Sequence, residues 1–143
     1  MKQLTNSSRR GQTLVEFALI LPILLLFTVM IFDLGRAVYY SSAIHNAARE
    51  AVRYGSVHNE ASTGWQGMMN AAIDKAIGVG LTNANFTAIG WGPDEPNGNH
   101  TVKMTITYSF TPATPLVASF LPGGDITLIA DAKMRTEYDK PNP

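Results

Sequence analysis

The chain has 143 residues, no cysteine, and eleven acidic residues against eleven lysines and arginines, so its formal net charge is zero. This length allows one domain of modest size, and the balanced charge gives no electrostatic basis for binding nucleic acid. The absence of cysteine excludes a disulfide framework, a thiolate metal site and a cysteine nucleophile.

The first third of the chain joins a basic leader to an apolar run. Residues 1–11 form a Ser-rich leader that ends in glycine, and residues 17–32 are sixteen consecutive uncharged residues. At 1.5 Å per residue the run spans about 24 Å, slightly less than the roughly 30 Å hydrocarbon core of a bilayer. Including Glu16 and the residues before it gives a spanning length. We therefore expect residues 12–34 to form a membrane-spanning segment.

The basic residues of the leader all precede the apolar run: Lys2, Arg9 and Arg10. By the positive-inside rule they keep the N-terminus in the cytoplasm, so that the C-terminal domain faces outward. A cleavable secretory signal is one alternative, but no small-residue cleavage site follows Phe32 promptly. An uncleaved signal anchor, which would tether an ordinary envelope protein, is another alternative.

Helical periodicity continues beyond the apolar run. Small and apolar residues recur at spacings of three and four from Ala37 to Gly55, which predicts one helix from about Thr13 to about Gly55 with residues 35–57 as an amphipathic half. Pro22 lies inside this helix. It should bend or loosen the helix because proline removes one backbone hydrogen bond.

Ala47, Ala51 and Gly55 form a ladder of small residues spaced four apart, a pattern that lets another backbone approach closely. Two interpretations are open. The ladder fits under a sheet of the same molecule, or it contacts a second subunit, and the pattern favours the first.

Residues 58–143 predict a small α+β head. A turn at 60–64 with Ser62 or Thr63 as N-cap precedes a helix from about Trp65 to Ile77. Strands follow at about 86–91, 101–110 and 126–138, with a polar turn at 92–99, a helical turn at 116–121 and a frayed tail from 139. Strict alternation in 101–110 indicates a sheet with one buried and one solvated face. The fold prediction is thus a long N-terminal stalk helix with a head of one helix and about three antiparallel strands.

Few groups have the spacing of catalytic or metal-binding residues. His45, His58 and His100 are too scattered to ligate a metal together, and Asp94 and Glu95 lie in a turn that could bind calcium only weakly. Asp33 and Arg36 close the apolar run, and their spacing predicts a helical i,i+3 ion pair worth a few tenths of a kcal/mol. We therefore expect no enzyme activity, cofactor or metal.

The sequence resembles a class III prepilin, and in particular the TadE-like family of minor pilins (pseudopilins) of Tad, or type IVc, pili. The stretches that carry the resemblance are residues 11–22, 33–36 and 47–55, with looser similarity over 102–115 and 126–135. The resemblance implies cleavage by a prepilin peptidase between Gly11 and Gln12, which makes Glu16 the fifth residue of the mature chain. Gln12 departs from the aromatic residue that type IV pilins favour at that terminus.

The resemblance further implies a structural role at the bacterial inner membrane, with the N-terminus inside and the C-terminus outside. Its expected partners are the peptidase, other pilin subunits, membrane lipid, and an assembly platform with its secretion ATPase. Assembly would place the subunit in an extracellular pilus. The size of the head favours a minor or priming subunit, with a main filament-forming subunit and a signal-anchored binding module as alternatives.

Glu16 is the residue for which we predict an assembly role, together with the bend at Pro22. An ionised side chain inside a membrane is costly unless it has a partner. The new α-amino group of Gln12 on an adjacent subunit would provide one, and the two charges would set the axial register. The competing interpretation is that Glu16 extends into the lipid headgroups and has no specific partner.

Overall fold

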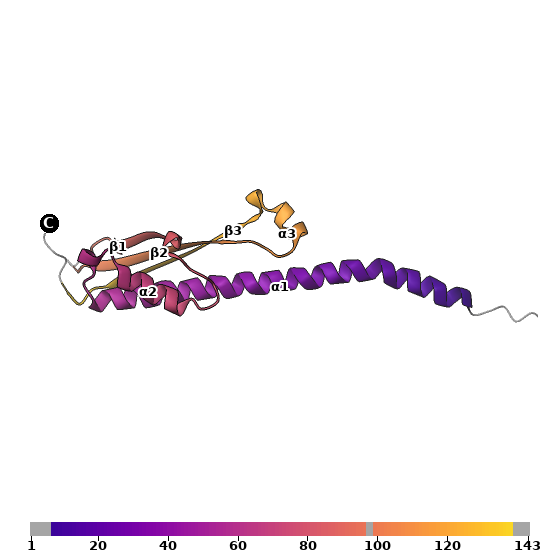
Figure 1. Cartoon of the computed structure of the whole chain (residues 1–143), viewed down its shortest axis with the longest axis horizontal. Coiled ribbons are helices and arrows are strands. Elements are labelled where there is room, and N and C mark those ends of the chain that lie inside the picture. The colour runs from indigo at the N-terminus through magenta and orange to yellow at the C-terminus, as the bar shows by residue number, and fades with distance from the viewer. Residues whose placement is uncertain (1–6, 97–98, 139–143) are drawn as a thin grey trace, which may run out of the picture.

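The computed structural model describes residues 7–96 and 99–138. A single long helix, α1 (Ser7–Val57), extends far beyond a small head that packs on its C-terminal half (Figure 1). The α+β prediction of a stalk helix with a small head is confirmed. Residues 1–6 of the leader, residues 97–98 of the expected turn and the tail 139–143 lie outside the described residues.

Helix α1 is longer than the sequence pattern predicted. It begins at Ser7, ahead of the expected start at Thr13, and ends at Val57. Residues 7–12 contain no proline, and one glycine costs a helix only about 1 kcal/mol relative to alanine, so the helix continues through the end of the leader. Figure 1 shows α1 bending within its indigo part, which contains Pro22, as the loss of a backbone hydrogen bond at proline would cause.

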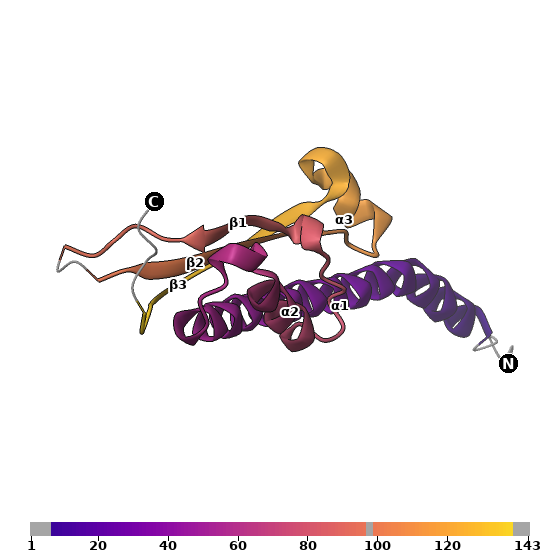
Figure 2. The same cartoon turned by 60° about the vertical axis from the view of Figure 1, so that its left-hand side comes forward.

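The head contains a three-stranded antiparallel sheet in the order β1-β2-β3. Its strands are β1 (Phe86–Trp91), β2 (Thr101–Phe110) and β3 (Ile126–Arg135). The β2–β3 pairing is continuous, from Thr101 opposite Arg135 to Phe110 opposite Ile126. Figure 2 shows the β1–β2 hairpin reaching the end of the molecule opposite the N-terminal part of α1.

Strand β3 ends at Arg135, so the predicted end near Tyr138 was wrong. Beyond Arg135 the chain turns toward the end of α1, where the Glu137 amide donates to the Ser56 carbonyl at 2.9 Å. The Tyr138 hydroxyl contacts the carbonyl oxygens of Gly55 and His58 at 2.5 and 2.9 Å. These last residues therefore satisfy carbonyl groups that the end of a helix leaves without partners.

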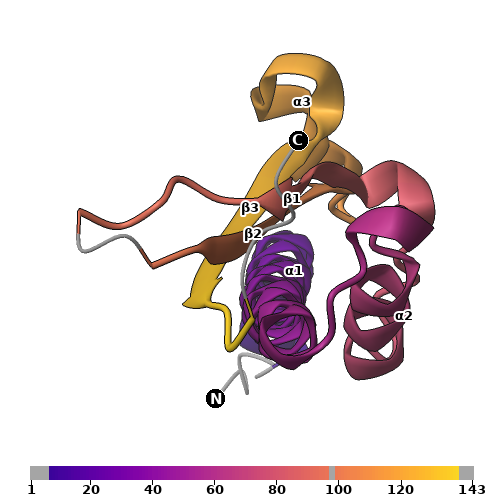
Figure 3. The same cartoon turned by 90° about the vertical axis from the view of Figure 1, so that its left-hand side faces the viewer.

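The core lies between the sheet and the C-terminal half of α1, with α2 (Gln66–Lys75) beside α1 (Figure 3). The alternation predicted for β2 is confirmed, because Val102, Met104, Ile106 and Phe110 are buried. The helices contribute further fully buried side chains to this core: Ile44, Ala47, Ala48, Ala51, Met68 and Ala72. Burial of this apolar surface is what holds the head on the stalk.

The predicted N-cap of the second helix, Ser62 or Thr63, was wrong. These residues form a short 3-10 turn, η1 (Ala61–Thr63), and α2 begins after Trp65, which has the left-handed φ of 63°. The first amide groups of α2 are satisfied from outside the helix. The Glu60 carboxylate accepts hydrogen bonds from the amides of Gly67 and Met68, which also places a negative charge at the positive end of the helix dipole.

Strands β2 and β3 are joined by a segment of residues 111–125 that we call the arm. It contains α3 (Pro115–Phe120), close to the helical turn predicted at 116–121, and a short 3-10 turn, η3 (Pro122–Gly124). At the root of the arm the Asp125 carboxylate accepts hydrogen bonds from the hydroxyls of Thr111 and Ser109 at 2.7 and 2.8 Å. These two bonds lower the pKa of Asp125 from its ordinary value of 3.8.

Candidate functional site

The N-terminal half of α1 carries the residues that the sequence singled out for processing and assembly. Gly11 and Gln12 lie inside the helix, and the Gln12 side chain donates to the Glu16 carboxylate at 3.2 Å, one helical turn away. Both side chains are exposed. Glu16 therefore has a hydrogen-bond donor within its own helix, which the sequence pattern did not reveal.

The apolar residues of this half do not pack against the head. Among the residues that the structure describes, one helix is long and apolar enough to cross a membrane, and its 18-residue apolar window has a mean hydropathy of 2.7. Phe17, Leu19, Ile23 and Phe32 all expose more than half of their surface. An uninterrupted apolar surface of this length is unfavourable in water, and its length is close to that needed to cross a bilayer.

The boundary between the two halves of α1 is formed by Asp33. Its carboxylate accepts hydrogen bonds from the amides of Ala113 and Thr114, both at 2.9 Å, and from the Thr114 hydroxyl at 2.5 Å. Arg36 adds the predicted ion pair at 3.3 Å. Because the side chain of Asp33 is only 6% exposed while that of Arg36 is 45% exposed, the arm and not Arg36 provides the main partners.

This contact corrects our interpretation of Asp33 as half of an ordinary surface ion pair. Hydrogen bonds to a charged acceptor contribute about 1.5–3 kcal/mol each, whereas an exposed i,i+3 pair contributes a few tenths. The residues that Asp33 joins are 80 and 81 positions apart, so spacing could not reveal them. A lone carboxylate at the end of an apolar run was the available signal, since such a charge needs a partner.

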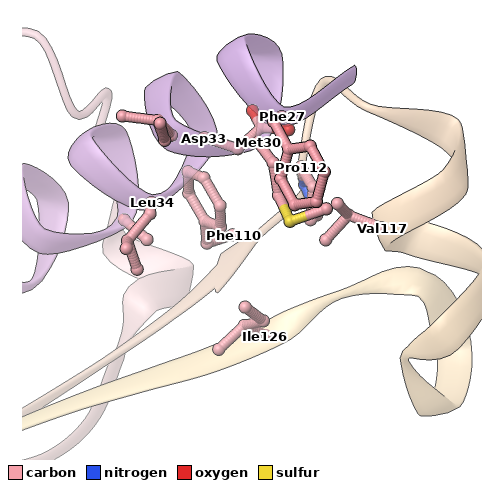
Figure 4. Close-up of a pocket in the computed structure, with 10 residues that line it drawn as sticks. Phe27, Met30, Asp33, Leu34, Phe110, Pro112, Val117 and Ile126 are labelled. Carbon is pink, nitrogen blue, oxygen red and sulfur yellow. The ribbon is translucent and has the colours of Figure 1, made fainter. Parts of the chain in front are cut away.

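An apolar pocket of about 280 Å³ lies beside Asp33, between α1 and the arm. Figure 4 shows Phe27 and Met30 of α1 on one side, with Pro112 and Val117 of the arm facing them. Phe110 and Ile126, at the ends of β2 and β3, close the side nearest the head. The pocket therefore bridges the apolar run and the head.

The small-residue ladder lies inside the head. Ala47 and Ala51 are fully buried, and Gly55 faces Met68 of α2 so closely that an added Cβ would lie 2.3 Å from the methionine sulfur. The ladder thus allows close approach of α2 within the same molecule. In this conformation the head of the same molecule covers this face of α1.

The far end of the head carries polar and aromatic groups. His100 contacts Asp94 at 3.1 Å, and Trp91 lies edge-on to both Trp65 and Tyr138. Within residues 7–96 and 99–138, no group of three or more histidine, aspartate or glutamate side chains is placed to hold a metal ion.

Residues 11–53 match the family model of TadE-like proteins, which confirms the resemblance predicted from the sequence over that segment. No significant match was found among curated proteins or among solved structures. The matched segment runs from Gly11 through the exposed apolar half of α1 and into the half that the head covers. It includes Gln12, Glu16, Pro22, Asp33, Ala47 and Ala51, while Gly55 lies just beyond it.

Residues 11–53 are thus similar to TadE-like proteins. The apolar helix near the N-terminus fits a membrane-anchored protein. The sheet and α2 of the head lie outside the matched residues.

Proposed function

We propose that this TadE-like chain is a minor or priming pilin subunit of a Tad-type pilus. A prepilin peptidase cuts it after Gly11, and it assembles through the N-terminal half of α1. The observation that carries the proposal is the combination of the family match over residues 11–53 with an apolar half-helix that the head leaves exposed. A pilin needs such a half-helix twice, first as a membrane anchor and then as the contact between packed subunits.

The proposed topology places the leader in the cytoplasm and the head outside the inner membrane. Before assembly the subunit contacts lipid and the assembly platform, and after assembly it lies in an extracellular pilus. We favour a minor role because the head, from about residue 58 onward, is large relative to the stalk. Quantifying this chain against the other pilins in purified pili would separate a minor from a filament-forming role.

Cleavage requires the first turns of α1 to open, because Gly11 and Gln12 are helical in the uncut chain. Glycine lowers the cost of this opening by about 1 kcal/mol relative to alanine, and its missing side chain lets the backbone extend in a peptidase site. These two effects are the physical role that we assign to Gly11.

After cleavage the Gln12 α-amino group carries a positive charge one helical turn from Glu16. We propose that Glu16 pairs with the amine of a neighbouring subunit. Gln12 and Glu16 of one chain are also within hydrogen-bonding reach of each other. Pairing of Glu16 with the α-amino group of its own chain therefore competes with pairing between subunits. Breaking a buried pair by removing one partner costs about 3–5 kcal/mol.

The test is the intact mass and N-terminal sequence of protein extracted from native membranes. A mature chain that starts at Gln12 supports the proposal, and the Gly11→Ala variant should accumulate as precursor. A functional protein that still begins at Met1 would instead support a signal-anchored binding module and exclude the pilin assignment.

A further inference from the structure

The arm has one charged residue, Asp125, at its root. Residues 111–124 include no acidic or basic residue, and they contain two prolines, a leucine, a valine and a phenylalanine before Leu121. Figure 1 shows α3 level with the middle of α1 along the helix axis, at the end of the head nearest the N-terminal half, and Figure 3 shows α3 standing away from α1. An uncharged segment at that level lies where the apolar run leaves the membrane.

The pocket residues give the depth of the arm along α1. The pocket that Val117 of α3 lines extends along α1 from Phe27, before the end of the apolar run at Phe32, to Ala37, beyond it. At 1.5 Å per residue, the pocket therefore reaches about 8 Å to either side of that end. Interfacial helices bury their apolar face to a similar depth of about 5–10 Å.

The contact at Asp33 explains how the arm can occupy this level. An unpartnered carboxylate at the edge of a bilayer would be costly, but Asp33 is 5% exposed and accepts three hydrogen bonds from Ala113 and Thr114. The arm thus satisfies the charge that ends the apolar run. In return, Asp33 fixes the root of α3 against α1.

The pocket is also continuous with the surface that faces lipid. Phe27, Ile31 and Leu34 line it and remain 56, 69 and 66% exposed, so they belong both to the pocket and to the outer surface of the apolar segment. Water in a space lined by such groups would find few hydrogen-bond partners. A lipid acyl chain would fill it with favourable contacts.

We propose that α3 and the pocket beneath it lie in the outer leaflet of the membrane, where a lipid acyl chain occupies the pocket. Before assembly the head is then held to the bilayer at two places, by α1 and by the arm. This inference rests on the proposed function, because it requires that α1 spans a membrane.

The absence of cysteine from the chain permits a direct test by site-specific labelling. The variants Val117→Cys and Ser119→Cys place an environment-sensitive fluorophore on α3. Ile23→Cys reports on the membrane span, and Asp74→Cys on α2 is the matched control on the head. Each full-length protein is reconstituted at low density into phosphatidylethanolamine–phosphatidylglycerol vesicles, with a spin-label quencher on the acyl chain near its carboxyl end.

The inference predicts that both α3 labels lose most of their fluorescence to the lipid quencher and are shielded from aqueous iodide. The label at position 74 should instead be quenched by iodide and not by the lipid quencher. Iodide quenching of both α3 labels, with the Ile23 label still quenched by lipid, would overturn the inference and leave the membrane span intact. If the Ile23 label also escapes the lipid quencher, the proposed function fails as well. Energy transfer between α3 labels on two copies, without lipid quenching, would identify a second subunit as the occupant and exclude lipid.

Discussion

Replacing Asp33 with alanine separates the arm from α1 without touching the core of the head. The substitution removes the acceptor for the amides of Ala113 and Thr114 and for the Thr114 hydroxyl. These donors lie at the start of the arm, whereas the core is formed by the sheet, α2 and the C-terminal half of α1. The expected effect is therefore local opening of residues 111–125 and not unfolding of the head.

The magnitude follows from the number and charge of these hydrogen bonds. Each bond to an ionised acceptor contributes about 1.5–3 kcal/mol, but the three share one carboxylate and are not additive. We expect a net loss of about 3–5 kcal/mol, similar to the cost of removing one partner from a buried ion pair. Since about 1.4 kcal/mol corresponds to a factor of ten, the opening equilibrium of the arm should shift by two to three orders of magnitude or more.

Hydrogen exchange of the full-length protein in detergent micelles measures this opening. Amides of the arm should exchange faster in Asp33→Ala by the factor above, while amides of β2 keep their protection. Asp131→Ala is the matched control, because Asp131 also accepts a threonine hydroxyl, from Thr105 at 2.6 Å, but does so on the exposed face of the sheet. Unchanged exchange in the arm of Asp33→Ala would refute the assignment of Asp33 as its main attachment.

Three further predictions follow from the geometry. Gly55→Val should destabilise the head by about 1–3 kcal/mol through overpacking against Met68, measured by chemical unfolding. At Gly35 an added Cβ meets nothing within 4 Å, so Gly35→Val should leave stability unchanged or raise it by a few tenths of a kcal/mol, because valine is a better helix former than glycine. Glu16→Ala should be inserted and cleaved normally but incorporated into pili about 100-fold less or worse, as expected for a lost pair of about 3–5 kcal/mol, and normal incorporation would remove its assembly role. The pKa of Asp125 is lower in the folded state, so its carboxylate stabilises the fold above the unfolded pKa, and this stabilisation is lost as the pH falls through the lower folded pKa. When the pH is lowered below about 4, the midpoint of chemical unfolding should therefore decrease in the wild type, and it should decrease less in Asp125→Asn.

The features that the sequence predicted well are those carried by local patterns. Alternation over residues 101–110 predicted which face of β2 is buried, and small residues spaced four apart predicted the side of α1 that faces the head. Both patterns are periodic because every residue of one face meets the same environment. The buried face of an element can therefore be predicted without knowing which element packs against it.

The features that the sequence did not predict depend on single contacts between distant residues. The Glu60 carboxylate caps the first amides of α2, although Glu60 lies outside the helix and before an intervening turn. The pattern of residues next to the helix favoured Ser62 or Thr63 instead. Asp33 was assigned to Arg36 for the same reason, since a partner three residues away is visible in the sequence and one 80 residues away is not. Local spacing thus identifies a permitted partner, and only the fold decides which partner dominates.

The division of α1 into a covered and an uncovered half limits how copies of this chain can pack. The small-residue face around Ala47 and Ala51 is occupied by the head of the same molecule, and Gly55 has no room beside Met68. The proposed assembly would therefore use other surfaces, and the half of α1 before Asp33 exposes many large apolar side chains. That half also carries Glu16, so the residue proposed to set the register lies on the surface that copies have available for packing.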